Sequence, residues 1–285
     1  MIEMLSYDFM QRALLAAVVV GTISPLIGVF LVQRRLALLG DGMGHVALTG
    51  VGLAFLVGTA PVPTALVLAA IGAVVLEIIR SRSRTAGDLA LALVFYGGIA
   101  GGVFFTSIAS GKSSTALNQY LFGSLSTVAT GDLVGLVIAA VAVITTLGIF
   151  GRQIFLLALD PDLAHTQGIR TSRVSMLLTV LAAVTVVVGM RTVGLLLISA
   201  IMIVPIAAAQ QLSRSFRATA LLGVVLGLAS CVAGLTVSFN LDVPPGPTIV
   251  FIALGLFAMC AALGLIVRRT WHRRERVSET AIAGS

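Results

Sequence analysis

Charged residues are scarce in this sequence of 285 residues. Asp, Glu, Lys and Arg make up 10% of it, whereas 58% of its residues are hydrophobic and its mean hydropathy is +1.11. Water-soluble domains carry about 25% charged residues, because their surfaces must be hydrated. The composition therefore excludes a soluble globular protein and indicates a chain that lies in a lipid bilayer.

Cysteines are few and a secretory signal is missing. Cys231 and Cys260 both lie in apolar runs far from any paired polar ligand, so the sequence indicates neither a disulfide framework nor a thiolate metal site. Glu3 and Asp8 precede the first apolar run, where a secretory signal would carry a basic segment, and no small-residue cleavage site follows. We therefore expect the first helix to be retained.

The sequence also lacks a nucleotide site. Residues 110–113, SGKS, end like a phosphate-binding loop, but the first glycine of that motif would fall at Thr106. We therefore expect that the chain is not an enzyme and that any ATP hydrolysis belongs to a separate subunit.

Long apolar runs fill most of the chain. A hydrocarbon core about 30 Å thick needs about 20 apolar residues per spanning helix. The break at Gly189–Arg191 is very short, so we predict an all-α, polytopic membrane helix bundle with eight or nine transmembrane helices over residues 1–270, followed by a basic tail at 271–285 that we expect to be disordered. The candidate spans are 9–32, 36–58, 61–79, 87–108, 131–150, 174–190, 192–211, 216–239 and 246–267.

The basic residues divide unequally between the two sides of this bundle. With nine spans, Arg12, Lys112 and Arg191 are the only ones of the 18 Lys and Arg residues that fall on one side. Because cytoplasmic loops are the basic ones, this places the N-terminus outside and the C-terminus in the cytoplasm. Membrane topology thus explains the net charge of +7, and we expect no nucleic acid partner.

One acidic residue and one histidine share a predicted span. Ionisable groups inside a membrane are costly, so each is a functional hypothesis. Asp41 and His45 stand four residues apart, which places a carboxylate and an imidazole on one helix face. These ligands suit zinc or manganese, and two ligands from each copy of a homodimer would make a four-ligand passage site. A buried Asp–His hydrogen bond, or a helix cap by Asp41, fits the same spacing.

A second short motif lies between the fifth and sixth spans. Asp160 can cap a helix, Pro161 suits its first position and Gly168 suits its end, so we predict a short cytoplasmic helix at 159–169. It would either dock into a partner or be an ordinary capped loop helix. The residues of this candidate docking helix are Asp160, Pro161, Asp162, Leu163, Ala164, His165 and Gly168.

Five blocks give the sequence a family resemblance over nearly its whole length. It resembles the permeases of zinc and manganese ABC importers, the partners of cluster A-I metal-binding lipoproteins. The departures from the usual DxxSHxxLPG pattern are Gly44 in place of Ser and Thr49 in place of Pro. The blocks are RRLALLGDGMGHVALTGVGLAF at 34–55, YLFGSL at 120–125, LDPDLAHTQGI at 159–169, VGLLLISAIMIVPIAAA at 193–209 and LDVPPGPTIV at 241–250.

The resemblance implies a type II ABC importer-like permease in the plasma membrane of a prokaryote. Two permeases, expected as a homodimer, would enclose a central pathway, and two cytoplasmic ATPases would bind through the 159–169 helix. An extracytoplasmic binding protein would deliver zinc or manganese, which is cargo and not a permanently bound cofactor. Asp41 and His45 match the acidic and histidine positions on the metal path of the family.

Three other functions remain open. A related importer for iron–siderophore or vitamin B12 would need a wider path with fewer ligands, and the short chain and the Asp–His pair argue against it. An ion-coupled secondary cation carrier predicts internal repeats, of which none is evident. An intramembrane enzyme would need an HExxH motif, a GxGD-like aspartate pair or a Ser–His arrangement, all of which are absent.

Overall fold

The computed structural model describes residues 6–82, 87–109, 119–123, 128–213 and 215–283. For residues 81–82, 87–88 and 267–283 it describes the helix but not the side chains. The SGKS stretch at 110–113 and part of the YLFGSL block lie outside these ranges. Within them the chain is helical, and no strand occurs.

Nine of the described helices are long and apolar enough to cross a membrane, so the fold class is confirmed with nine spans among the described residues. The short helix α7 is the exception. α11 runs on through residues that we assigned to the tail, so the boundary at 270 and the disorder beyond it stay predictions. The helices are α1 (Asp8–Gln33), α2 (Leu39–Val57), α3 (Pro61–Arg82), α4 (Gly87–Ile108), α6 (Thr130–Leu159), α7 (Pro161–Thr166), α8 (Thr171–Val193), α9 (Leu195–Leu212), α10 (Phe216–Leu241) and α11 (Pro245–Ala283).

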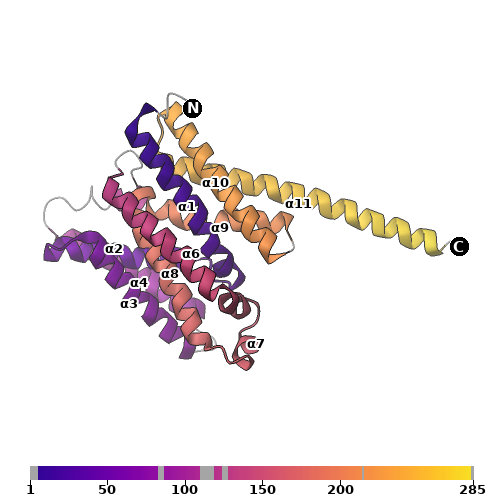
Figure 1. Ribbon diagram of the computed structural model, residues 1–285, viewed down its shortest axis with the longest axis horizontal. Coiled ribbons are helices and arrows are strands. Elements are labelled where there is room, and N and C mark those ends of the chain that lie inside the picture. Colours follow the sequence, from indigo (N-terminus) through magenta and orange to yellow (C-terminus); the bar gives the residue numbers. More distant parts are fainter. Residues whose placement is uncertain (1–5, 83–86, 110–118, 124–127, 214, 284–285) are drawn as a thin grey trace.

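The bundle has a buried centre and a lipid-facing exterior. More than half of the spanning residues of α1, α2, α8 and α9 are buried, whereas α3, α4, α6, α10 and α11 turn most of theirs outward. The outward side chains include large apolar ones such as Leu93, Ile138 and Phe251, which suit acyl chains. α2, α3 and α4 lie on one side of α8, and α10 and α11 lie on the other side of α1 and α9 (Figure 1).

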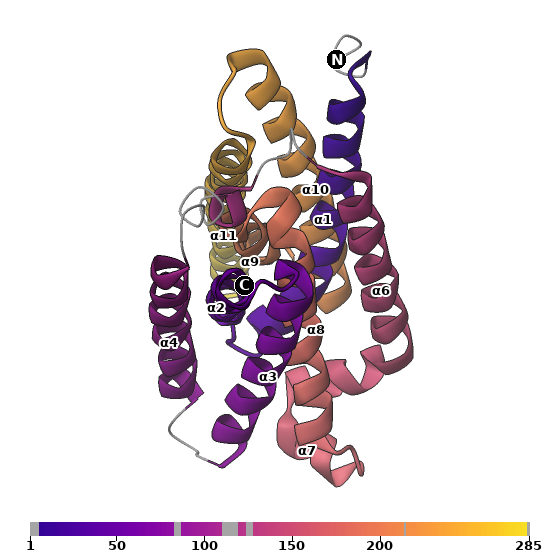
Figure 2. The ribbon, with the colours of Figure 1, turned by 90° about the vertical axis from the view of Figure 1, so that its left-hand side faces the viewer.

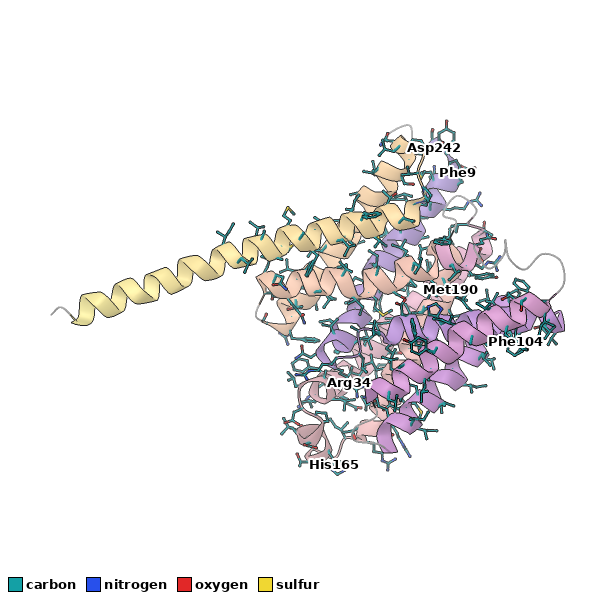
Figure 3. The ribbon with its side chains drawn as sticks, turned by 180° about the vertical axis from the view of Figure 1, so that it is seen from behind. Phe9, Arg34, Phe104, His165, Met190 and Asp242 are labelled. Carbon is teal, nitrogen blue, oxygen red and sulfur yellow. The ribbon has the colours of Figure 1, made fainter. Side chains whose placement is uncertain are left out.

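The two ends of the bundle carry different features. α7 lies at one end, far from the N-terminus (Figure 2). Arg34 and His165 belong to this α7 end, whereas Phe9 and Asp242 lie at the opposite end, where α1 begins and α10 meets α11 (Figure 3). α6 has 30 residues and is therefore about 45 Å long, which exceeds the hydrocarbon core by about 15 Å. α6 therefore runs past both the hydrocarbon core and the predicted limit at residue 150.

The break between the sixth and seventh spans lies at Gly194, and our placement of it at Gly189–Arg191 was wrong. α8 continues through Arg191, whose guanidinium Nε lies 3.0 Å from Asp132 Oδ1 of α6, so this charge can remain within the helix. Gly194 alone separates α8 from α9, with φ 87° and ψ 151°. This region of backbone conformation is essentially restricted to glycine.

Replacing Gly194 by Ala should therefore destabilise the fold. A Cβ there would overlap the backbone of Phe122 and lie 2.5 Å from the amide nitrogen of Gly123, and the backbone strain alone costs about 1–3 kcal/mol. We expect less folded protein in the membrane and a lower Tm in detergent. Gly131→Ala in α6 is the matched control, because a Cβ there meets no other group within 4 Å; equal behaviour of the two variants would contradict this account of the break.

Candidate functional site

Asp41 lies in the first turn of α2 but does not cap the helix. The residue that caps α2 is Leu38, and the N-terminus has no side-chain cap hydrogen bond. Asp41 is the third residue of the helix, where a carboxylate is favoured by the helix dipole. The interpretation of Asp41 as a helix cap is therefore wrong, and its carboxylate makes no capping hydrogen bond.

His45 lies one turn further along the same face of α2. Both side chains are half-buried, and the described residues contain no hydrogen bond between them, so the buried Asp–His bond is not found either. Nor does the described part of the chain hold a group of three or more His, Cys, Asp or Glu residues that could bind a metal. Asp41 and His45 can thus offer a cation two ligands from one chain, and a four-ligand site would need a second chain.

The His45 ring is placed by α4. It packs edge-on against the Phe95 ring, with 4.9 Å between centroids. One turn later the Thr49 hydroxyl donates to the carbonyl oxygen of Gly98 at 2.8 Å and also approaches the carbonyl oxygen of His45 at 3.3 Å. The face of α2 that carries the candidate ligands is therefore held against α4 at His45 and one turn after it.

Close approach of α4 to α2 depends on glycine. A Cβ at Gly98 would lie 2.7 Å from the backbone of His45 and Val46, and a Cβ at Gly101 would lie 2.8 Å from Thr49 Cγ2. Small residues at such contacts are the usual means by which membrane helices approach each other. The sequence GGIAGG at 97–102 thus brings the α4 backbone against the backbone of His45.

The two departures from the family pattern also have a structural setting. A side chain at Gly44 would overlap Leu195 Cδ1 of α9, so glycine allows α9 to pack against α2 at this position. The hydroxyl of Thr49 makes the bond to Gly98, which a proline could not make. Both departures therefore act on helix packing around the Asp41–His45 pair.

The predicted short helix is present as α7, and its caps are those expected. Asp160 Oδ1 accepts hydrogen bonds from the backbone N–H groups of Asp162 at 2.8 Å and Leu163 at 3.2 Å. At the other end Gly168 has φ 77°, and the Gly168 and Ile169 N–H groups donate to the carbonyls of His165 and Ala164. α7 is exposed except for Ala164, so most of its surface is open to a partner.

A polar cluster at the α7 end was not predicted from the sequence. Glu77 is 3% exposed inside the span of α3, and its Oε2 lies 3.4 Å from Arg80 Nη1. Thr179 Oγ1 of α8 donates to Glu77 Oε2 at 3.5 Å, and Arg34 Nη1 donates to Ser175 Oγ of α8 at 2.8 Å. We call these five residues the α7-end cluster. An acidic residue inside a predicted span, with arginine three residues later, was the signal that could have revealed it.

The α7-end cluster holds two guanidinium groups and one carboxylate. The pKa of Arg34, which follows the end of α1, is lowered to about 10, first by burial and then by the positive charge of Arg80, while Glu77 acts in the opposite direction. Arg34 therefore remains charged at neutral pH. Arg80 Nη1 is buried and makes no hydrogen bond within the described structure, so the ion pair with Glu77 is its compensation.

Nine candidate spanning helices among the described residues, a half-buried carboxylate–imidazole pair and an exposed capped helix at one end fit a polytopic membrane permease. The chain belongs to the ABC 3 transport family, whose model matches residues 6–264. This family and the relatives named next confirm the resemblance to the permease subunits of metal-ion ABC importers.

Individual relatives cover most of the chain. It is 31% identical to the manganese import system permease protein ScaB of Streptococcus gordonii, over 88% of this chain and 90% of that protein. It is 28% identical to the high-affinity zinc uptake system membrane protein ZnuB of Haemophilus influenzae, over 89% and 97%. Among solved structures, PsaBC from Streptococcus pneumoniae in complex with Fab matches with a TM-score of 0.80 and 30% identity, over 90% of this chain and 92% of that one.

Gly98→Ala should disturb the candidate site, because the added methyl group would push α4 away from the backbone of His45. We expect transport activity to fall at least as steeply as folded protein in the membrane. Gly97→Ala is the matched control, since a Cβ at this neighbouring helical glycine has no contact within 4 Å. Measured transport and membrane content that are alike for the two variants would contradict the glycine contact.

Proposed function

We propose that this chain imports a divalent metal ion, zinc or manganese, from the cell exterior into the cytoplasm of a prokaryote. The observation that carries the proposal is the half-buried Asp41–His45 pair on one face of a spanning helix. Carboxylate and imidazole ligands together suit both metals, and the relatives named above are manganese and zinc permeases.

The number of ligands supports a homodimer around the pathway. One chain supplies two ligands, and a two-fold axis beside α2 would bring two carboxylates and two imidazoles together. We propose that the second permease is a copy of this chain and that the metal passes between the two. Discrimination between zinc and manganese then belongs largely to the extracytoplasmic binding protein, because Asp and His accept both.

The charge distribution supports the orientation. Arg34 and Arg80 cluster at the α7 end, with Arg152, Arg170 and Arg173 in the segments next to α7, whereas Arg12 and Arg191 belong to the other end. Basic residues favour the cytoplasmic side, so we propose that α7 faces the cytoplasm and that the nine spans leave the C-terminus there as well. The exposed helix α7 is then the contact for a separate cytoplasmic ATPase, through Asp160, Pro161, Asp162, Leu163, His165 and Gly168, while Ala164 belongs to the helix but is buried.

Asp41→Asn and His45→Ala should each abolish metal-dependent growth of a strain that has this permease as its route for zinc or manganese. Asp41→Asn removes only the charge from the path, whereas His45→Ala also removes the ring contact with Phe95, so the amount of folded protein in the membrane is measured for both variants. Cell metal content is measured by mass spectrometry, with Asp8→Asn as the control, because it removes an exposed carboxylate from the first turn of α1. Normal zinc and manganese contents in both site variants would end the ligand proposal.

Asp160→Ala should weaken the binding of the ATPase, whereas Asp160→Asn should retain it. Alanine removes the oxygen that accepts from Asp162 and Leu163, a loss of about 1 kcal/mol to a helix of six residues, and asparagine keeps that acceptor. The measurement is the amount of ATPase that copurifies with the permease. Equal recovery with both variants would show that the order of α7 does not matter for this contact.

A further inference from the structure

Only residues 167–170 separate α7 from α8, and hydrogen bonds close the helix end on each side of them. The Ile169 N–H donates to the carbonyl of Ala164 at 3.1 Å, which closes the end of α7. The Arg173 and Val174 N–H groups then donate to the carbonyl of Arg170, which opens α8. Because the connection is this short, we expect a displacement of α7 to displace the first turns of α8, where Ser175 lies.

Backbone hydrogen bonds also close the turn between α1 and α2. The Arg35 N–H donates to the carbonyl of Val32 at 3.0 Å and the Leu36 N–H to that of Leu31 at 2.8 Å, and the Leu39 N–H then donates to the carbonyl of Leu36 at 3.0 Å. Arg35 adopts φ 58°, a left-handed conformation that costs a residue with a Cβ about 1–2 kcal/mol and that the turn nevertheless imposes. Arg34 is therefore rigidly joined to the first turn of α2, which carries Asp41.

Ser175 and Arg34 connect these two rigid units. Arg34 Nη1 donates to Ser175 Oγ at 2.8 Å, and Ser175 is 2% exposed, so water does not compete for this bond. Hydrogen bonds to charged groups are the stronger ones, and their direction is fixed by the geometry of the guanidinium. The contact joins residues that are 141 positions apart in the sequence.

Glu77 keeps this contact from being driven apart. Arg34 and Arg80 repel each other, and the Glu77 carboxylate pairs with Arg80 while it also attracts Arg34. Thr179 extends the connection to α8, because its hydroxyl approaches both Glu77 Oε2 at 3.5 Å and the carbonyl of Ser175 at 3.0 Å. The α7-end cluster thus joins α3, α8 and the α1–α2 turn at one point.

We propose that Arg34 is a positioning residue that transmits movements of α7 and α8 through Ser175 to Asp41, with Glu77 maintaining the contact. This inference rests on the proposed function, since it assigns the route by which movements driven by ATP hydrolysis, in the ATPase bound at α7, reach Asp41 and His45. None of the residues in the cluster binds the metal itself. Loss of the contact between Arg34 and Ser175 should leave the complex folded and able to hydrolyse ATP, but should uncouple ATP hydrolysis from metal import.

The decisive variant is Ser175→Ala in the full complex of permease, ATPase and binding protein, reconstituted in proteoliposomes. Metal imported per ATP hydrolysed is measured with Zn²⁺ and with Mn²⁺. We expect this ratio to fall about tenfold, the scale of one hydrogen bond to a charged group, while ATP hydrolysis and Tm stay near the wild-type values. A merely structural role of Ser175 would lower Tm and hydrolysis together and leave the ratio unchanged.

Ser230→Ala is the matched control. Ser230 is 1% exposed in a spanning helix, but its hydroxyl donates to the carbonyl of Leu226 in its own helix, at 2.7 Å. It should therefore keep the wild-type ratio. Arg34→Gln should reproduce the Ser175→Ala defect, and the double variant should be no worse than Arg34→Gln alone, because both changes break the same contact.

The outcomes separate the inference from the function on which it rests. A Ser175→Ala ratio within twofold of wild type, in a complex that imports metal, overturns the role of Arg34 and leaves the proposed function intact. A wild-type complex that hydrolyses ATP without importing either metal overturns both. Should Arg34→Gln fail to assemble, Ser175→Ala still decides the question, because it removes one buried hydroxyl and adds no volume.

Discussion

A polar atom inside a bilayer has no water to bond with, and this constraint governs where the protein can form contacts between helices. Among the described residues, most buried hydroxyl groups bond within their own helix: those of Thr185 and Ser230 each donate to the carbonyl four residues earlier, as does that of the half-buried Thr236. Such bonds satisfy the hydroxyl and leave the neighbouring helix free. They add nothing to the arrangement of one helix relative to another.

Two places among the described residues carry hydrogen bonds that cross between helices near α2, and the Arg191–Asp132 ion pair joins α8 to α6 elsewhere. Thr49 joins α2 to α4 next to His45, and the α7-end cluster joins the α1–α2 turn and α3 to α8. Both places involve α2 or the turn directly before it. Polar contacts therefore help to position the helix that carries the candidate ligands, as they also position α8, which takes part in the α7-end cluster and in the Arg191–Asp132 pair.

Features that depend on neighbouring residues could be predicted from the sequence. The lengths of the apolar runs gave nine candidate spans, and the order of Asp160, Pro161 and Gly168 gave α7 with both of its caps. Local rules suffice there, because helix caps and membrane thickness act over a few residues or over one helix. The spacing of Asp41 and His45 belongs to the same class, although their role as ligands stays a prediction.

Features that depend on distant residues could not be predicted in this way. Arg191 suggested a break between spans because its partner Asp132 lies 59 positions earlier, and the pair cannot be inferred from either segment alone. Gly98 is one of many glycines in the sequence, and nothing near it indicates that it faces the backbone of His45. Glu77 was visible as a charge within a span, but its partners in α8 follow from the fold.

In the proposed site each chain supplies two ligands, an arrangement that fits transport better than storage. A site with four protein ligands from one chain would bind zinc tightly, and every increment of affinity would be an increment of the barrier to release. When the ligands are divided between two chains, affinity depends on the distance between the two α2 helices. A movement that separates them then lowers the affinity without any change in the ligands themselves. This is why the position of α2, set by α4 beside His45 and by Arg34 before Asp41, matters more for the proposed passage of metal than the pair of side chains considered alone.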